Sequence, residues 1–304
     1  MNPPTATAAP ITIFCTPKPF VGHFDLIQRN ALQNWHALAP VPEILVFGDE
    51  PGAAEAAERV GAVHIPQVRR NAHGTPLISD MFSVAQRRAS NSVLCYTNAD
   101  ILFFPDLFAA IAVAEAQPRP YLLTGRRHDV DVVTPIDFTN AGAVRELIAH
   151  AREAGKRYPP LGMDYFVFQR GKLPTLPDFA VGRPRWDNYM LYHARKHKLL
   201  VIDATDAIFA IHQNHDYSHH KAGTRGVWEG AEAQANLDLA GGWDYIFTLK
   251  NATHTMNSAG KLQESRLQSP FEKLSEFGAL HTWSRRPLGL ARRAKRRVLG
   301  HGSA

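Results

Sequence analysis

Short apolar segments alternate with amphipathic segments along the first hundred residues of the chain. Runs of apolar and β-branched residues that end at glycine, proline or charged residues are typical of buried strands. Between them, apolar residues recur at the spacing of a helix that packs one face on a sheet. The pattern predicts strands at 11–15, 43–47, 62–65 and 93–96, and helices at 24–38, 53–60 and 78–89. Such alternation predicts a mostly parallel sheet with helices on its faces.

The pattern becomes less regular after residue 104 but continues to residue 215. Helix-like and strand-like segments still follow one another, and neither an internal repeat nor a long low-complexity stretch interrupts them. The pattern predicts helices at 107–115 and 143–154 and another that ends at Lys196, with strands at 121–124, within 161–168, at 199–202 and at 207–211. We therefore predict one α/β domain over residues 1–280, whose first half is 11–104 and whose second half is 105–280, and a separate tail at 281–304.

The composition is that of an ordinary globular protein, with 45% hydrophobic and 20% charged residues. The two cysteines, Cys15 and Cys95, lie in apolar strand-like runs, so we expect them to be reduced and buried. No apolar run approaches the length of a membrane span, and residues 1–10 lack the pattern of a signal peptide. A cytoplasmic location is the expectation.

The positive net charge of the chain, +6, comes from its end. The tail carries seven of the 34 basic residues and no acidic residue, so 27 basic and 28 acidic residues remain in the rest of the chain. The body therefore lacks the basic surface that nucleic-acid binding needs, and we expect no nucleic-acid partner. Within 285–297 the arginines alternate with apolar residues at helical spacing, which suits peripheral contact with an anionic membrane; a solvated terminus is the alternative.

The segment with the clearest chemistry is Ser92–Phe104, an apolar strand that ends at Asn98-Ala99-Asp100. Ligands of parallel sheets gather at the carboxyl ends of the strands. An aspartate at such a position can hold a divalent cation, which in turn can hold a diphosphate. Asp100 could instead only cap the following turn, because Pro105 and Asp106 come shortly after it.

The order of these signals resembles that of glycosyltransferases of the GT-A fold, which transfer a sugar from a nucleotide diphosphate. The resemblance extends from Ile11 to His215, about two thirds of the chain. It rests on short motifs in the same order as in the family, namely Thr16-Pro17, Gly48-Asp49, Arg70-Asn71 with Gly74, Asn98-Ala99-Asp100, Gly162-x-Asp164, Trp186-Asp187-Asn188 and a late histidine. The resemblance implies a nucleotide-binding first half, an acceptor-binding second half, and neighbouring first and fourth strands that bring Cys15 and Cys95 close together.

The resemblance also implies a nucleotide site built from the first half of the chain. Asp49 is the expected contact of the base, Arg70 opposes phosphate charge, and Asp80 and Asn98 are the candidates for the ribose. The complete expected set is Thr16, Gly48, Asp49, Arg70, Asn71, Asp80 and Asn98. For Asp49 and Asp80, the alternatives are a turn residue and an ordinary acid at a helix N-terminus.

For the metal, the resemblance implies Mn²⁺ or Mg²⁺ held by Asp100 and a late histidine, for which His212 is chosen ahead of His215. The family usually has Asp-x-Asp where this chain has Asn98-Ala99-Asp100, which weakens the expected metal affinity. The histidines His212, His215, His219 and His220 could instead hold zinc, but no cysteine lies nearby and no His-Glu-x-x-His motif exists.

For catalysis, the resemblance implies an acidic base at the start of a helix that faces the acceptor. Asp187 matches that position, and Asp164 is its rival; an N-cap role is the alternative for Asp187. Gly162, Trp186 and Asn188 complete the expected acceptor site, with Trp186 as a surface for a sugar ring unless it is simply buried.

The expected function is metal-assisted sugar transfer to a glycan, lipid-linked or small-molecule acceptor. A non-catalytic sugar or nucleotide binder of the same fold is one alternative, and a scaffold that acts at a membrane surface through the tail is another. A sugar-phosphate nucleotidyltransferase is less favoured because the loop at Thr16–Phe20 has no glycine. Neither Gly-x-Gly-x-x-Gly nor a P-loop occurs, which argues against a dehydrogenase and a P-loop nucleotide hydrolase.

Overall fold

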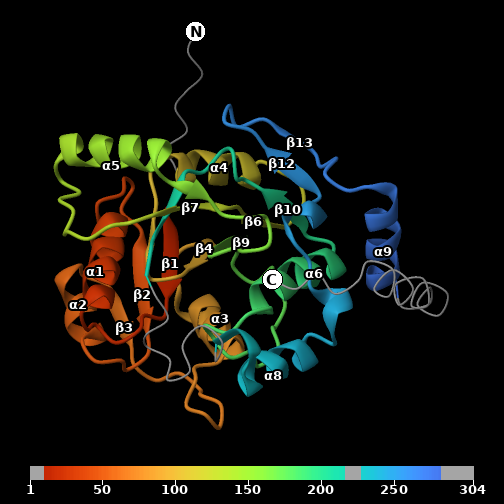
Figure 1. The fold of residues 1–304 in the computed structure, drawn as a ribbon, viewed down its shortest axis with the longest axis horizontal. Helices are drawn as coiled ribbons and strands as arrows, with labels where there is room; N and C mark the ends of the chain where they lie inside the picture. Colours follow the sequence, from red (N-terminus) through yellow and green to blue (C-terminus); the bar gives the residue numbers. More distant parts are fainter. Residues whose placement is uncertain (1–9, 216–226, 282–304) are drawn as a thin grey trace.

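A nine-stranded mixed sheet forms the centre of the protein in the computed structural model, which describes residues 10–215 and 227–281 (Figure 1). Its strands lie in the order β13-β12-β10-β6-β9-β4-β1-β2-β3, and neighbours are parallel except at β9 and at the β12-β13 edge. The strands are β1 Ile11–Cys15, β2 Glu43–Phe47, β3 Val63–Ile65, β4 Val93–Thr97, β6 Tyr121–Thr124, β9 Tyr165–Gln169, β10 Leu200–Asp203, β12 His254–Met256 and β13 Leu262–Glu264.

A second sheet of four short strands lies beside the carboxyl end of β4. Its order is β5-β11-β7-β8, with β11 parallel to β7 and the other pairs antiparallel. The strands are β5 Ile101–Leu102, β7 Arg127–Val130, β8 Lys156–Arg157 and β11 Ala210–Gln213. Because β5 follows β4 after only three residues, this sheet joins the main sheet at Asn98-Ala99-Asp100.

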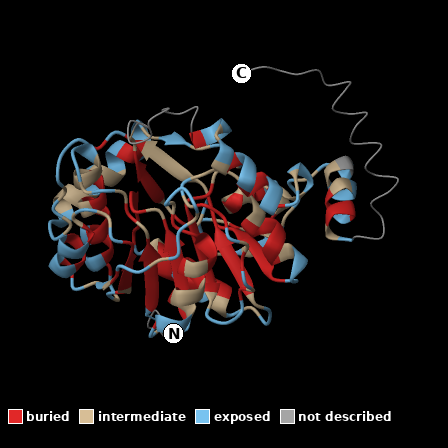
Figure 2. Cartoon of the chain, turned by 90° about the horizontal axis from the view of Figure 1, so that it is seen from below, coloured by how far each residue is buried: buried red, intermediate tan, exposed pale blue. Residues whose placement is uncertain are grey.

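Helices cover both faces of the main sheet, so that the strands are buried between them (Figure 2). Alternate residues of β1 show the division: Ile13 belongs to the core under α1, α2 and α4, and Phe14 to the core under α3 and α6. The helices are α1 His23–His36, α2 Ala53–Arg59, α3 Ile78–Arg88, α4 Asp106–Glu115, α5 Ala141–Glu153, α6 Trp186–Lys196, α8 Ala231–Leu239 and α9 Pro270–Leu280, with short 3₁₀ turns η1 Trp243–Tyr245 and η2 Leu249–Asn251.

The predicted fold class, a mixed and mostly parallel sheet flanked by helices, is confirmed. The predicted bounds of β1, β2 and β6 match the structure at both ends. Strands β1 and β4 are neighbours, as expected, with Ile13 opposite Cys95, and both cysteines are buried free thiols. The basic segment 285–297 and the histidines His219 and His220 lie outside the described residues. Among the described helices, none has the length and apolar character needed to cross a membrane.

The direction of β9 was not predicted, and it matters for the site. This strand runs antiparallel between β4 and β6, and Tyr165 at its start pairs with Thr97 at the end of β4. Asp164, the residue before β9, therefore lies at the same edge of the sheet as Asn98, and the backbone N–H of Asn98 donates to the carbonyl of Asp164 at 2.9 Å.

Helix α1 is fastened to the segment that follows Asp100 by buried side-chain hydrogen bonds. The Asn34 amide donates to the carbonyl of Phe103 at 3.0 Å and accepts from the N–H of Phe103 at 2.7 Å. The Trp35 indole donates to the carbonyl of Ile101 at 2.9 Å. These bonds hold the backbone on the carboxyl side of Asp100 against a rigid helix.

Replacing Asn34 tests this attachment. We expect Asn34→Ala to lower the free energy of unfolding by about 2 kcal/mol, because two buried backbone groups lose their partner. Gln33→Ala, an exposed position on the same helix, is the control and should stay within about 0.5 kcal/mol of the original protein. Urea unfolding measures both changes, and equal changes in the two variants would contradict this account.

Candidate functional site

A pocket of about 440 Å³ opens where the carboxyl ends of β1 and β4 meet the second sheet. Its lining comes from both halves of the chain, including the loop after β1, the Asn98–Asp100 turn and the loop before α6. Residues predicted for the nucleotide, the metal, catalysis and the acceptor thus border one pocket, and ten of the predicted site residues line it: Thr16, Arg70, Asn98, Asp100, Gly162, Asp164, Trp186, Asp187, Asn188 and His212.

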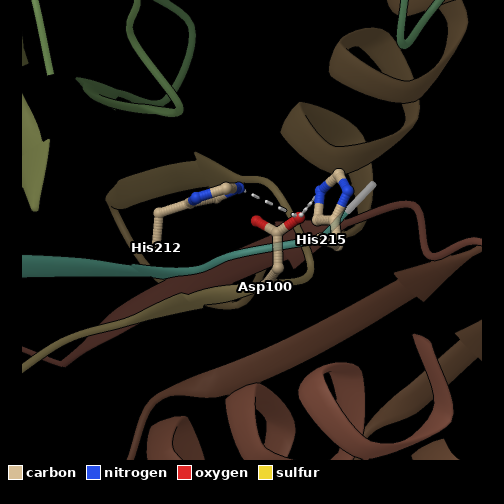
Figure 3. Close-up of side chains that lie close together, drawn as sticks. All are labelled: Asp100, His212 and His215. Atoms are coloured by element: carbon tan, nitrogen blue, oxygen red, sulfur yellow. Dashed lines mark hydrogen bonds and ion pairs between the residues drawn. The ribbon is translucent and has the colours of Figure 1, made fainter. Parts of the chain in front are cut away.

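Three potential metal ligands converge at one end of this pocket. Asp100, His212 and His215 each offer a ligand atom within 4.8 Å of the others, and Figure 3 shows both rings directed toward the carboxylate. One oxygen of Asp100, Oδ2, lies 3.2 Å from Nε2 of His215 and 3.9 Å from Nε2 of His212. The prediction chose His212 over His215, whereas the structure places both beside Asp100.

The donors of this cluster suit a divalent cation. The other oxygen of Asp100, Oδ1, is buried and has no hydrogen-bond partner among the residues that the structure describes. Burial alone would raise the pKa of Asp100, but His212 and His215 outweigh it and hold the pKa well below its usual value. A carboxylate that is ionised, buried and free on one oxygen, next to two imidazoles, matches the ligand preferences of Mn²⁺.

Register across the second sheet places a further carboxylate behind His212. Asp129 on β7 pairs directly with His212 on β11, and its Oδ1 lies 3.1 Å from Nδ1 of His212. A carboxylate at Nδ1 favours a proton there and leaves Nε2 free for a metal ion. The contact is at ion-pair distance but does not meet the geometry of a hydrogen bond. Asp129 thus lies behind the potential ligand as a charged neighbour without itself belonging to the cluster.

Arg127 connects this carboxylate to the opposite side of the pocket. Its Nε donates to Asp129 at 2.8 Å, and its Nη1 forms a short ion pair with Asp164. The other carboxylate oxygen of Asp164 accepts from the amide of Asn98 at 2.7 Å. Although burial opposes its charge, the guanidinium between Asp164 and Asp129 has a pKa raised above the usual value, so Arg127 stays charged.

Asp187 differs from Asp164 in its surroundings. It lies in the first turn of α6, after Arg185 at the N-cap, so it is not itself the N-cap residue. Desolvation raises the pKa of Asp187 to about 7, helped by the neighbouring Asp164 charge, while backbone N–H groups oppose the shift. Asp187 therefore changes charge near neutral pH, which suits a group that accepts and releases a proton.

The side of the pocket that was predicted to bind a nucleotide contains fewer of the predicted residues. Arg70 lines it, donates to the carbonyl of Gly74 at 2.7 Å and pairs with Asp49 and Glu50. Asp49 is exposed at the rim rather than in the lining. Gly48 is behind the lining, with a positive φ of 102° and its Cβ position 3.5 Å from the Thr16 hydroxyl.

Asn71 and Asp80 lie outside the lining, and their bonds stabilise the loop between β3 and α3. The Asn71 amide oxygen accepts from the N–H groups of His73 and Thr75, and its Nδ2 donates to Glu232 at 2.7 Å. Asp80 accepts from the N–H of Arg69 at 2.8 Å. These contacts fix the loop that carries Arg70, so both residues support the pocket without lining it.

The predicted acceptor residues are arranged by packing. A Cβ at Gly162 would lie 2.3 Å from the ring of Tyr158, so glycine is required for that ring to stack 4.0 Å from the guanidinium of Arg127. Trp186 is 6% exposed and packs perpendicular to Tyr96, so little of its surface borders the pocket. Asn188 donates to the carbonyls of Leu161 and Phe247, which holds two wall segments together.

Sequence reasoning gave no role to five residues, namely Arg127, Asp129, Lys18, Arg183 and Trp228, and all of them except Asp129 line the pocket. In the sequence, Arg127 and Asp129 belong to a run of charged residues that resembles a solvated loop. The signal that could have found them is alternation, because the two side chains of β7 that point to one face are both charged.

No protein-family model and no curated protein sequence matches the chain. Similar solved structures include glucosyl-3-phosphoglycerate synthase from Mycobacterium tuberculosis with Mg²⁺ and UDP, at 14% identity over 77% of this chain and 80% of that chain, with a TM-score of 0.47. The same enzyme with Mn²⁺, UDP and phosphoglyceric acid is 15% identical over 77% of this chain and 80% of that chain, with a TM-score of 0.46. Mannosyltransferase PcManGT from Pyrobaculum calidifontis with GDP-Man and Mn²⁺ is 18% identical over 69% of this chain and 60% of that chain, with a TM-score of 0.40. At these identities the likeness concerns the fold, and it assigns no role to a residue of this chain.

The three-residue cluster predicts Mn²⁺ binding that can be measured without any substrate. We expect Asp100→Asn to abolish binding and Asp129→Asn to weaken it about tenfold, because the second change removes only the charged neighbour of His212. Titration followed by the electron paramagnetic resonance of free Mn²⁺ gives both affinities. His254→Ala, a half-buried histidine on β12, is the control and should bind as the original protein does. Undiminished binding by Asp100→Asn would rule out this cluster as the site.

Proposed function

We propose that this protein is a metal-assisted glycosyltransferase that moves a sugar from a nucleotide diphosphate to an acceptor hydroxyl. The observation that carries the proposal is one pocket that holds a cation-ligand cluster, Asp100 with His212 and His215, and a carboxylate poised near neutral pH, Asp187. Lys18 in the same lining adds positive charge for phosphates; Arg70 also lines the pocket, but Asp49 and Glu50 already pair with it.

In this proposal the cluster holds Mn²⁺ or Mg²⁺, which supplies positive charge to the diphosphate. Lys18 lies close enough to Asp100 to lower its pKa, so its ammonium belongs to the same charged region. These groups stabilise the negative charge that collects on the departing nucleoside diphosphate. The acceptor oxygen forms a bond to the anomeric carbon as that carbon loses its bond to the diphosphate oxygen.

Asp187 is the proposed base that takes the proton from the acceptor hydroxyl. Its rival, Asp164, has one carboxylate oxygen on Asn98 and the other on Arg127, so it is already committed on both sides. Asp164 instead keeps a negative charge near Asp187 and thereby helps to raise its pKa. A base with a pKa near 7 combines a useful ionised fraction with real proton affinity.

Binding of nucleotides tests the proposal most directly. We expect one of UDP, GDP, CDP and dTDP to bind in the presence of Mn²⁺, and Asp100→Ala to lose that binding, because the cation links the diphosphate to the protein. Calorimetry with and without Mn²⁺ measures this, and His254→Ala again serves as control. Failure of all four diphosphates to bind would refute the transferase, whereas binding of a sugar nucleotide that is never cleaved would favour a non-catalytic binder.

The pKa of Asp187 predicts the pH dependence of the reaction. We expect kcat/KM to rise about tenfold per pH unit up to pH 7 and then to level, because only the ionised carboxylate accepts a proton. Asp187→Asn should lower the rate about a thousandfold and remove this dependence. A profile that still bends near pH 7 in Asp187→Asn would assign the bend to another group.

Stability gives an independent measure of the same pKa. The folded value, about 7, lies above the ordinary value of 3.8, so ionising Asp187 costs folding free energy as the pH rises between the two values. Asp187→Asn lacks this cost, and its stability relative to the original protein should increase from pH 4 to pH 7 and then stay constant. Urea unfolding at several pH values checks this, with the exposed Asp238→Asn as control.

A further inference from the structure

We propose that the acceptor of this transferase is uncharged and presents an apolar face; the inference rests on the function proposed above. It comes from the wall of the pocket formed by residues 158–164, 181–188 and 227–228. Among the described residues of that wall and the strand behind it that line the pocket, the cations, Arg183 and Arg127, are already paired with carboxylates, and the large exposed side chains are apolar. Arg185 belongs to the same stretch but not to the lining, and its Nη1 donates to the carbonyl of Ala233.

Arg183 is the first of these cations. Its Nε and Nη2 donate to the same oxygen of Glu232, at 2.9 and 2.7 Å, and its Nη1 donates to the carbonyl of Gly182 at 3.2 Å. Both side chains are 13% exposed. All three guanidinium nitrogens therefore have partners, and a phosphate or carboxylate on the acceptor would have to displace a half-buried ion pair to reach them.

Arg127 is the second cation, and carboxylates already take two of its three guanidinium nitrogens. Asp129 and Asp164 take its Nε and Nη1, and the ring of Tyr158 covers one face of the guanidinium at 4.0 Å. One guanidinium between two carboxylates leaves net negative charge on this side, to which Asp187 adds when it is ionised, and this charge would repel an anion. An anionic acceptor would thus meet negative charge, while both cations of the described lining of this wall are already paired with carboxylates.

The same wall offers apolar surface to an acceptor. Leu161 is 47% exposed and Trp228 is 40% exposed, and both line the pocket. Val181 and Met163 extend this lining. Large side chains that stay exposed inside a pocket gain free energy when a ligand covers them, and an indole also stacks against the C–H face of a sugar or an aromatic ring.

Three glycosides separate the two parts of the proposal, the absence of charge and the apolar face. Methyl β-D-glucoside, p-nitrophenyl β-D-glucoside and p-nitrophenyl β-D-glucuronide differ by one aromatic ring or by one carboxylate. We expect the p-nitrophenyl glucoside to bind the full-length protein about tenfold more tightly than either of the others. Ligand-observed NMR titration gives the three dissociation constants.

Two variants assign the preference to the wall. Leu161→Ala should weaken binding of the p-nitrophenyl glucoside about fivefold, whereas Leu239→Ala, a leucine of α8 that is 45% exposed outside the pocket, should not. Glu232→Gln should improve binding of the glucuronide about tenfold because it releases Arg183 from its carboxylate. The glutamine can still accept the bond from Asn71, and circular dichroism verifies that the variant folds.

Equal or tighter binding of the glucuronide would overturn the uncharged acceptor, and equal binding of the methyl glucoside would overturn the apolar face. Failure of all three glycosides to bind would overturn the inference as a whole. The proposal that the protein is a transferase is tested by the Asp100-dependent binding of a nucleoside diphosphate, which these probes do not measure. The two failures are therefore distinguishable in the same protein preparation.

Discussion

One guanidinium, that of Arg127, holds the two sheets of this protein in register at the candidate site. It binds Asp129 of the small sheet and Asp164 at the start of the antiparallel strand of the large sheet. Asp129 in turn contacts His212, and Asp164 holds the side chain of Asn98, two residues before Asp100. The spacing between the cluster of Asp100, His212 and His215 and the acidic side chains Asp164 and Asp187 therefore depends on an ion-pair network. Each charge in this network is partly buried, so removal of one partner is costly.

The reversed direction of β9 has a direct part in this arrangement. A parallel β9 would begin at the opposite edge of the sheet and carry Asp164 away from Asn98. Because β9 starts beside the end of β4, an acid from the second half of the chain enters the cleft of the first half. Fold and site thus share one cause, because β9, which joins β4 to β6 in the sheet, also places Asp164 in the pocket.

Local patterns in the sequence predicted most of the strands and the residues at their carboxyl ends, because burial and turn chemistry act over a few residues. Asp100, His212 and Asp187, which line the pocket, were predicted in this way. Arg127 and Asp129 were missed because their partners lie 37 and 83 residues away, and only the pairing of β7 with β11 brings Asp129 to His212. Asn71 and Asp80 were predicted for the nucleotide, whereas their local hydrogen bonds serve the loop that carries Arg70.

Glu232 joins two parts of the pocket that the sequence separates widely. One carboxylate oxygen accepts from Asn71 in the loop of Arg70, and the other accepts from Arg183 in the opposite wall. A displacement of that loop would break the first bond and release one oxygen of the carboxylate that Arg183 faces, without changing its charge. If a bound molecule displaces the loop, the opposite wall responds through this carboxylate, and the coupling free energy is then the same whichever molecule arrives first.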